Sequence, residues 1–459
     1  MTTTAPTRVP EFGCAHLHDR RVRLGRPVAL ALLGLLLLLP LPLAALEPQV
    51  RAAGPALVLS VLAGALAVSG LVAQSSLPTR WRWLRPVVDA DQVLRWHRRI
   101  AGLVVIATTL HVAALAVADP AGFRHLIGPS APLRAKLAVV ATVALVLLCA
   151  LSMWRKQLRL RYDIWRATHL FMTAVVVVTA VLHSVLVERA QKDSGATAQS
   201  WLWGALGAVA VISLIRFRLV RPLRSRSTPY RIVAVLEEQG DAVTVELAAQ
   251  GHDGMQFRPG QFAYLRVGDS PLSLDEHPFS YSGNSDRQDR PQFTVKTGGE
   301  FTSRIAQLPA GTPMLIDGPY GSFCPDSETS GFILVCGGVG VTPAFSLLTT
   351  LAERGDPRAH LLILACRTPA EAPLGDKLDG LADQLDLEVV LVPSQPPAGW
   401  RGASGRLDSG TLRRLVPHDG RFRQAYLCGP PGLVKMATQT LLRVGLPRRH
   451  VHAELFDSA

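Results

Sequence analysis

The stretch Val93–Ala118, VLRWHRRIAGLVVIATTLHVAALAVA, places two histidines, His97 and His111, in an apolar run long enough to cross a membrane. The two residues are fourteen positions apart. At about 100° and 1.5 Å per residue, this interval returns to within about 40° of the same helix face while it rises about 21 Å. Both imidazoles are therefore predicted to face the same way, one near each side of the hydrocarbon core.

A second apolar run, Trp165–Val187, repeats this interval with His169 and His183. The repetition predicts two helices that stand side by side, with His97 opposite His169 and His111 opposite His183. Imidazole is a common ligand of haem iron, and ionisable groups at membrane depth are usually functional. The pattern therefore favours two haem irons stacked across the bilayer. The alternatives are polar contacts between helices and a proton relay in a transporter.

Apolar runs of spanning length predict six transmembrane helices, all in the first half of the chain. The runs occupy about residues 27–46, 54–73, 93–118, 133–152, 165–187 and 201–215, and none follows residue 226. Pro40 and Pro42 lie inside the first run, where a membrane helix tolerates a kink. We therefore predict an N-terminal tail (1–26), a membrane domain (27–220) and a linker (221–228) that leads to a soluble region.

The net charge of +13 is distributed by membrane side. Arginines and lysines crowd the N-terminal tail and the loops at 80–99, 155–166 and 216–226, whereas the alternate loops hold few. The positive-inside rule then places both termini and the soluble half in the cytoplasm of a multi-pass protein of the cell membrane. The pair His97–His169 would lie at the cytoplasmic end and the pair His111–His183 at the outer end. Because topology accounts for the basic residues, nucleic-acid binding is not expected.

The six cysteines follow no pattern of a metal or cluster site. They are Cys14, Cys149, Cys324, Cys336, Cys366 and Cys428, with no C-x-x-C pair and no ferredoxin spacing. None of them falls in a predicted outer loop. We therefore expect neither an iron–sulfur cluster nor a disulfide.

From about Tyr230 the pattern changes to short β runs separated by turn residues. Runs at 231–237, 242–248, 261–267 and 292–296 predict a small antiparallel β-barrel over residues 229–325. Within it, the segment His277–Ser282, HPFSYS, combines a polar donor, aromatic rings and hydroxyls on one extended stretch. Such a surface would suit a flavin; an ordinary strand with alternating hydroxyls is the alternative.

Residues 326–459 alternate instead between strands, glycine loops and helices. A buried-strand run, Phe332–Val335, is followed by Gly337, Gly338 and Gly340, and Thr342 is placed to cap a helix with Pro343 at its first position. A helix N-terminus behind glycines can bind a diphosphate. Further strands are predicted at 361–365 and from Tyr426. This pattern predicts a doubly wound nucleotide-binding domain, although the glycines do not match G-x-G-x-x-G and a loop of structural glycines is the alternative.

Taken together, these motifs resemble the superfamily of transmembrane NADPH oxidases and ferric reductases, whose cytoplasmic half is similar to ferredoxin–NADP reductase. The resemblance implies an all-α six-helix membrane bundle with two haems, an antiparallel β-barrel FAD domain and an α/β doubly wound NAD(P) domain. The expected haem ligands are His97, His111, His169 and His183. The expected FAD contacts are His277, Pro278, Phe279, Ser280, Tyr281, Ser282, Lys296, Gly298, Gly299, Phe301 and Thr302.

The resemblance also implies a dinucleotide site and a set of catalytic residues. Expected along the dinucleotide are Gly318, Pro319, Tyr320, Gly321, Gly337, Gly338, Gly340, Thr342, Pro343, Gly429 and Pro430. Cys428 would lie beside the nicotinamide, and Glu454 and Phe456 belong to a closing motif whose aromatic ring covers the flavin. In a doubly wound domain the end of the second strand meets the adenosine ribose, and Arg367 there favours NADPH over NADH. His277 replaces the arginine of the soluble reductases, which is typical of the membrane branch.

The implied activity is electron transfer from cytoplasmic NAD(P)H through FAD and two b-type haems to an acceptor on the outer face. Superoxide-producing oxidases resemble one another in a second histidine one turn beyond the outer ligand, where this chain has Leu115. A ferric chelate, which Arg124, His125, Arg134 and Lys136 could attract, is therefore the favoured acceptor over oxygen. An electron-transfer module for a partner protein and a transporter with a regulatory nucleotide domain are the remaining alternatives.

Overall fold

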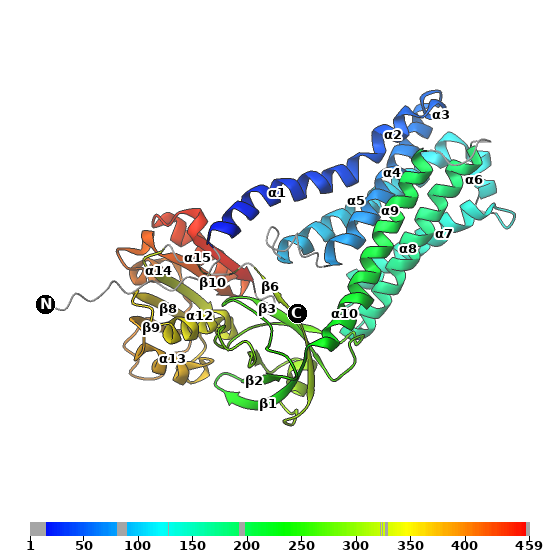
Figure 1. Cartoon of the computed structure of the whole chain (residues 1–459). Coiled ribbons are helices and arrows are strands. Elements are labelled where there is room, and N and C mark those ends of the chain that lie inside the picture. Colours follow the sequence, from blue (N-terminus) through cyan, green and yellow to red (C-terminus); the bar gives the residue numbers. More distant parts are fainter. Residues whose placement is uncertain are drawn as a thin grey trace. The chain divides into compact units, whose positions relative to one another are not determined.

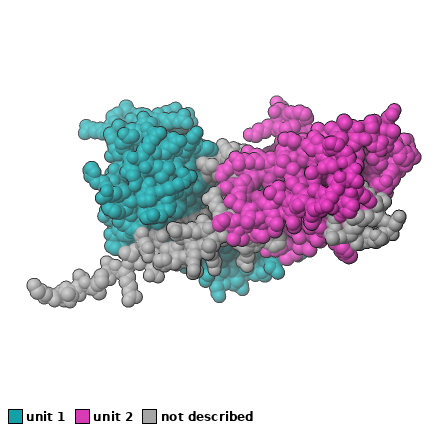
Figure 2. Space-filling view, turned by 90° about the horizontal axis from the view of Figure 1, so that it is seen from above, with its two compact units in different colours: residues 1–21, 222–459 teal, residues 22–221 magenta. Residues whose placement is uncertain are grey.

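The computed structural model describes residues 15–79, 90–126, 128–191, 198–321, 323, 325 and 329–455. The chain divides into two compact units, one of residues 22–221 and one of residues 222–459 with 1–21 (Figure 1, Figure 2). The first unit is helical, and the second contains two β-sheets with their covering helices.

The helical unit is built from segments that match the predicted spans. Its helices are α1 (Ala15–Leu38), α2 (Pro40–Leu46), α3 (Pro48–Arg51), α4 (Pro55–Ser76), α5 (Ala90–Ala118), α6 (Pro120–Leu126), α7 (Leu133–Met153), α8 (Tyr162–Gln191) and α9 (Ala198–Ile215), and the short α10 (Arg221–Arg224) crosses the division between the units. Among the described residues, six segments are long and apolar enough to cross a membrane. The prediction of six spans is therefore confirmed. The first span is interrupted at Leu39, directly before Pro40, because proline cannot continue the hydrogen bonding of the preceding turn.

The helices of this unit pack in pairs. Helix α4 lies against α5, α7 lies against α8, and α9 contacts both α4 and α8. At Gly70 the first pair is so close that a Cβ atom there would come within 2.6 Å of Val104 Cγ2. On the outer faces, Ile106 and Val117 are 66% and 72% exposed. Apolar side chains exposed over whole helix faces are covered by lipid in a membrane protein.

The first sheet of the other unit is antiparallel. Its strands are β1 (Pro229–Glu238), β2 (Ala242–Ala249), β3 (Phe262–Val267), β4 (His277–Ser280), β5 (Gln292–Lys296) and β6 (Pro313–Tyr320), in the order β4-β3-β6-β1-β2-β5. Within the described part of the chain, only an isolated bridge between Tyr281 and Phe293 joins the two edges. The prediction of an antiparallel domain is confirmed, but a closed barrel is not, because no continuous ladder links β4 to β5. The short helix α11 (Glu300–Ile305) buries Phe301 and Ile305 in the core of this sheet.

The second sheet is parallel and doubly wound. Its strands are β7 (Phe332–Gly337), β8 (His360–Cys366), β9 (Leu387–Pro393), β10 (Gln424–Gly429) and β11 (Val451–Leu455), in the order β11-β10-β7-β8-β9. Helices α12 (Thr342–Glu353) and α13 (Gly375–Ala382) cover one face. Helices α14 (Ser409–Leu415) and α15 (Pro431–Arg443) cover the other, as Figure 1 shows. The order reverses between β7 and β10, and open α/β sheets bind ligands at such a point.

Polar contacts fix the two sheets of this unit to each other. Ser346 of α12 donates to the Gly283 carbonyl at 2.7 Å, and the Ser285 amide donates to Thr350 Oγ1 at 3.0 Å. At the rim of this contact, Arg354 makes two hydrogen bonds to the Asp286 carboxylate, at 2.8 and 2.6 Å. The loop after β4 is thereby held against α12.

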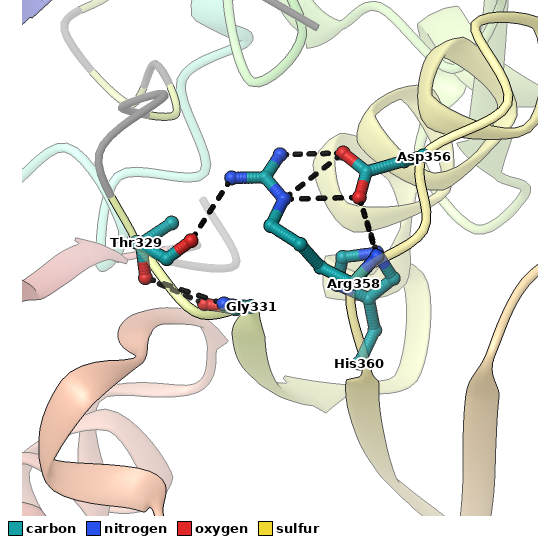
Figure 3. A network of polar contacts seen from close by, with 5 residues as sticks. All are labelled: Thr329, Gly331, Asp356, Arg358 and His360. Carbon is teal, nitrogen blue, oxygen red and sulfur yellow. Dashed lines mark hydrogen bonds and ion pairs between the residues drawn. The ribbon is translucent and has the colours of Figure 1, made fainter. Parts of the chain in front are cut away.

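A buried ionic cluster closes the end of the parallel sheet opposite the strand carboxyl ends (Figure 3). Asp356 binds the Arg358 guanidinium, with Arg358 Nε at 2.9 Å from Asp356 Oδ1, and His360 Nε2 lies 3.7 Å from the same oxygen. Arg358 also donates to the Thr329 carbonyl at 3.3 Å. The cluster therefore ties the chain before β7 to the start of β8.

Candidate functional site

The four histidines of the membrane unit meet in two pairs. The ring centres of His97 and His169 are 6.3 Å apart, and those of His111 and His183 are 6.4 Å apart. In both pairs the first member comes from α5 and the second from α8. The structure thus brings together the residues that the repeated interval had paired.

Each of these histidines has an oxygen partner for Nδ1. Three partners are backbone carbonyls: Gln74 for His97 at 3.2 Å, Ser60 for His111 at 2.8 Å and Arg134 for His183 at 2.8 Å. The fourth is Ser152 Oγ, 3.2 Å from His169 Nδ1. Histidines that bind a metal usually donate one ring N–H to such a partner, which leaves the other nitrogen for the metal.

The separation within each pair fits one iron between two imidazoles. Rings on opposite sides of a metal ion have centres about 6 Å apart, because each metal–nitrogen bond is about 2 Å and the coordinating nitrogen lies about 1 Å from its ring centre. With Nδ1 engaged, Nε2 of each ring is the nitrogen available for this bond. Both pairs therefore fit a haem that is held by two histidines.

The Nδ1 partners are site residues that the sequence reasoning missed. Ser60 and Gln74 both lie on α4 and are fourteen residues apart, the same interval as the two histidines that they hold. The interval itself can be counted in the sequence, but no residue type marks its two ends, because Ser60, Gln74 and Arg134 all contact the imidazoles through backbone carbonyls.

In the antiparallel sheet, the predicted flavin segment meets the predicted second loop. His277 on β4 lies over Phe301 of α11, with ring centres 4.2 Å apart, and Phe279 is stacked on the same ring at 5.9 Å. His277 Nε2 is 3.0 Å from Asp275 Oδ1, and Asp275 also binds Arg304. Of the loop glycines, Gly298 has open space around it, and the Gly299 amide donates to Thr302 Oγ1 at 3.1 Å.

The remainder of the HPFSYS segment faces inward. Tyr281 is fully buried and stacked on Phe257 at 4.0 Å, and its burial raises the pKa of the phenol well above its usual value. Ser280 and Ser282 are also buried, and within the described part of the chain their hydroxyls have no hydrogen-bond partner. Buried hydroxyls are costly to leave unpaired, so those two groups fit a polar ligand beside β4. The Tyr281 hydroxyl likewise has no partner among the described residues, although its ring packs in the core of the sheet.

The segment Gly318–Gly321 continues β6 beside β3. Gly318, joined to Pro319 by a cis peptide bond, leaves no room for a side chain, because a Cβ atom would lie 2.7 Å from Ala263 Cβ. Tyr320 donates to Asp317 Oδ1 at 2.6 Å and its ring lies 5.6 Å from that of Tyr264. Lys296 ends β5 with an exposed side chain.

At the switch point of the parallel sheet, the loops after β7 and β10 touch each other. A Cβ at Gly340 would come within 2.5 Å of the Cys428 carbonyl, and one at Gly337 would come within 3.0 Å of Pro430 Cδ. Contact between the two loops therefore explains why glycine is needed at these two positions. This is what the alternative of a loop of structural glycines predicts. Gly338, at φ +53, has open space beside it.

The start of α12 differs from its predicted form. Thr342 is the first helical residue and Pro343 the second, and the residue before the helix is Val341. The Thr342 hydroxyl donates backward to the Val339 carbonyl. The prediction that Thr342 caps the helix was wrong, because the turn Gly338–Val341 precedes the helix and takes up its hydroxyl.

The predicted catalytic residues lie along β10 and β11. Cys428 is paired in register with Cys336 on β7 and with Glu454 on β11. Its thiol is buried, and burial, followed by the charge of Glu454, raises its pKa well above the usual value. Cys428 is therefore a neutral thiol at physiological pH. Phe456 lies outside the described residues.

Arg367 follows the last residue of β8, as predicted. Its side chain is exposed, and Nε donates to Gln395 Oε1 at 3.3 Å. The carboxyl end of this strand is the place where a doubly wound domain meets the adenosine ribose. Gln395 was not predicted and holds the guanidinium over that edge.

Two family models match the chain, one in each unit. Residues 63–181 match the ferric reductase like transmembrane component, and residues 334–439 match the oxidoreductase NAD-binding domain. The first match contains His97, His111 and His169, and the second contains the glycines of the switch point.

Curated relatives match the second unit. The ferredoxin reductase component of 3-ketosteroid-9-alpha-monooxygenase from Rhodococcus rhodochrous is 27% identical over 242 residues, which are 52% of this chain and 67% of that protein. The reductase component of phenol 2-monooxygenase from a Pseudomonas species is 30% identical over 214 residues, 45% of this chain and 59% of that protein. The chain thus spans about two thirds or less of the length of these relatives.

Among solved structures, a flavohemoglobin from Malassezia yamatoensis with bound FAD and heme has a TM-score of 0.47 at 19% identity, covering 90% of this chain and all of that one. The relatives and the NAD-binding match together identify the second unit as an oxidoreductase module for FAD and NAD(P). The chain therefore has the domain architecture of the ferric reductase and NADPH oxidase superfamily, in which a ferric-reductase-like transmembrane component is joined to such a module.

Proposed function

We propose that the chain is a transmembrane NAD(P)H oxidoreductase that passes electrons through FAD and two b-type haems to an acceptor on the outer face of the cell membrane. The observation that carries this proposal is the geometry of the four histidines. Two pairs on α5 and α8, each with the ring separation of a bis-histidine iron site, have their Nδ1 atoms engaged and their Nε2 atoms available.

The second unit supports the other half of the proposal. When bound, FAD takes two electrons from a nicotinamide and releases them singly, and each haem carries one. The switch point between β7 and β10 would receive the dinucleotide, and the buried hydroxyls of Ser280 and Ser282 would face the flavin. Cys428, held as a neutral thiol, would line the nicotinamide end of that crevice without placing a negative charge there.

The arginine-rich loops support an orientation with the second unit in the cytoplasm. On that orientation His111 and His183 serve the outer haem. His111 and His183 would together hold that haem and leave its iron no open position, so the acceptor would bind at the protein surface near this end of the bundle. We favour a ferric chelate, since Leu115 supplies no polar group and Arg124, Arg134 and Lys136 are positively charged.

The experiment is to measure haem and flavin in the purified protein and in histidine variants. Wild type should hold two haems and one FAD per chain, whereas His111→Ala or His183→Ala should hold one haem. Both variants should still oxidise NAD(P)H with a soluble dye, because the flavin precedes both haems. His125→Ala, which changes a histidine of the short helix α6, is the control and should keep both haems. Two haems in either ligand variant would overturn the assignment.

A further inference from the structure

Among the four paired histidines, His169 is the one whose described Nδ1 contact is with a side chain and not with a backbone carbonyl. The other three contact backbone carbonyls, which no substitution can remove. His169 contacts Ser152 Oγ at 3.2 Å, from the neighbouring helix α7. A substitution at Ser152 can therefore remove the described Nδ1 contact of His169 altogether.

The surroundings of His169 offer no replacement for this hydroxyl. Ser152 lines a small hollow with Trp165, Thr168 and otherwise apolar side chains. The indole of Trp165 can only donate, and its N–H is buried without a partner among the described residues. Thr168 precedes His169 directly on α8, and side chains at adjacent helix positions do not face each other; its hydroxyl donates to the carbonyls of its own helix at 3.0 and 2.9 Å. Removal of the serine hydroxyl would leave His169 Nδ1–H without an acceptor.

Ser60 provides an internal comparison at the other pair. Its hydroxyl is 3.1 Å from His111 Nδ1, but its own backbone carbonyl is closer, at 2.8 Å, and the hydroxyl also donates to the His111 carbonyl at 2.9 Å. Loss of this hydroxyl leaves the carbonyl contact in place. The two serines therefore differ in one respect: Ser152 is the sole Nδ1 partner in the described region, and Ser60 is an additional one.

We propose that Ser152 is a positioning residue that sets the reduction potential of the haem bound by His97 and His169. This inference rests on the proposed function, since it requires that haem. With Nε2 on the iron, Nδ1 carries the proton and donates it to Ser152 Oγ. A hydrogen bond of this kind raises the basicity of the imidazole and so stabilises the ferric state. Without this hydrogen bond, His169 donates less electron density to the iron, and the ferrous state becomes more stable relative to the ferric state.

The test is a redox titration of the reconstituted holoprotein, followed by haem absorbance and fitted to two one-electron components. Ser152→Ala should raise the potential of one component, with about a tenfold change in its ferrous-to-ferric ratio, which is about 59 mV for one electron. Ser152→Thr, which keeps the hydroxyl, should restore the wild-type value. The shifted component should be the one that remains in His183→Ala.

Ser60→Ala is the matched control and should leave both components unchanged. An unshifted pair of components in Ser152→Ala, or an equal shift in Ser60→Ala, would overturn the inference. If Ser152→Ala loses one haem, Ser152→Cys takes its place, because sulfur is a weaker acceptor, and it must shift the same component upward. A wild-type protein without haem would instead refute the proposed function, so the two failures are distinguishable.

Discussion

Asp356 keeps its charge although its side chain is buried. Burial alone would raise the pKa of this carboxyl, but the contacts with His360 and Arg358 outweigh it and hold the pKa well below the usual value. Arg358 in turn lies over the Phe332 ring at 5.0 Å, and His360 is stacked on the same ring at 5.4 Å. The charge is therefore part of the packing between β7 and β8.

We predict that Asp356→Asn lowers the free energy of unfolding of this unit by about 3–5 kcal/mol, because the buried Arg358 guanidinium loses its counter-charge. A depressed carboxyl pKa contributes stability that is fully present above the unfolded value of about 3.9 and is lost as the pH falls through the folded value. The wild-type advantage over the variant should therefore be constant near neutral pH and shrink below about pH 4. Thermal melting over a pH series measures this, and Asp379→Asn, an exposed acid on α13, is the control. An advantage that persists unchanged at acid pH would contradict the assignment.

At the end of β8, Arg367 is predicted to favour NADPH by accommodating the 2′-phosphate. Arg367→Ala should lower kcat/KM for NADPH by about 10-fold, as expected for loss of a charge-assisted hydrogen bond of about 1.5 kcal/mol, and leave kcat/KM for NADH nearly unchanged. Steady-state rates with a soluble dye give both values. Arg401→Ala, another arginine of this unit, is the control. If the ratio of the two constants stays at its wild-type value, Arg367 does not select the nucleotide.

Helix α4 packs against α5 and contacts both of its histidines through the backbone carbonyls of Ser60 and Gln74. Gly64 is central to this contact, because a Cβ there would lie 2.9 Å from His111 Nδ1 and 3.1 Å from Cε1. An imidazole with Nδ1 bound to the Ser60 carbonyl cannot move away without losing that bond. Gly64 is therefore needed for His111 to occupy its position as a haem ligand.

We predict that Gly64→Ala reduces haem content from two to one per chain, through displacement of His111. Gly204→Ala on α9 is the matched control, since open space surrounds that glycine and alanine is the better helix former by about 1 kcal/mol. The pyridine haemochrome assay on purified protein gives the stoichiometry. Full haem content in Gly64→Ala, or equal loss in both variants, would show that this contact does not position the ligand.

Elements with a strong period were predictable from the sequence, and those that depend on distant contacts were not. The intervals of α5 and α8 paired the histidines correctly because helix geometry alone relates residues fourteen apart. The prediction that Thr342 caps α12 was wrong because the turn Gly338–Val341 precedes Thr342. The loop after β10 holds this turn in place. Ser152 gave no signal, since only the packing of α7 on α8 brings its hydroxyl to His169.

The whole molecule combines a helical unit whose outer faces are apolar with a unit that carries buried polar networks. The division falls between Arg221 and Pro222, inside a basic segment. Composition and charge predict a membrane half followed by a soluble half, because long apolar runs occur in the first half alone and basic residues crowd alternate loops. The sequence did not show that the antiparallel sheet stays open, because strand patterns do not say whether the edge strands β4 and β5 pair; in the described residues an isolated bridge joins them.

An electron that crosses the bilayer without a proton carries net charge across it. Electron transfer through the complete chain can therefore be tested by its dependence on membrane potential. In sealed vesicles with NADPH outside and a ferric chelate inside, only chains with the second unit outward can act, since NADPH does not cross lipid. Each electron transferred works against about 2.3 kcal/mol per 100 mV of potential that it builds. Chelate reduction should therefore start fast, slow within the first turnovers, and recover when valinomycin and potassium dissipate the potential. His183→Ala should abolish reduction inside the vesicles while NADPH oxidation by an external dye continues.

Superoxide dismutase trapped with the chelate identifies the acceptor in the same vesicles. Reduction that is unaffected by the enzyme, and that persists without oxygen, means that the chelate takes the electrons directly. Leu115 supports this outcome, because one turn beyond His111 it offers an oxygen molecule no hydrogen bond. Reduction that dismutase abolishes would make oxygen the acceptor and the chain a superoxide producer. An unchanged rate with and without valinomycin would contradict electron transfer across the membrane altogether.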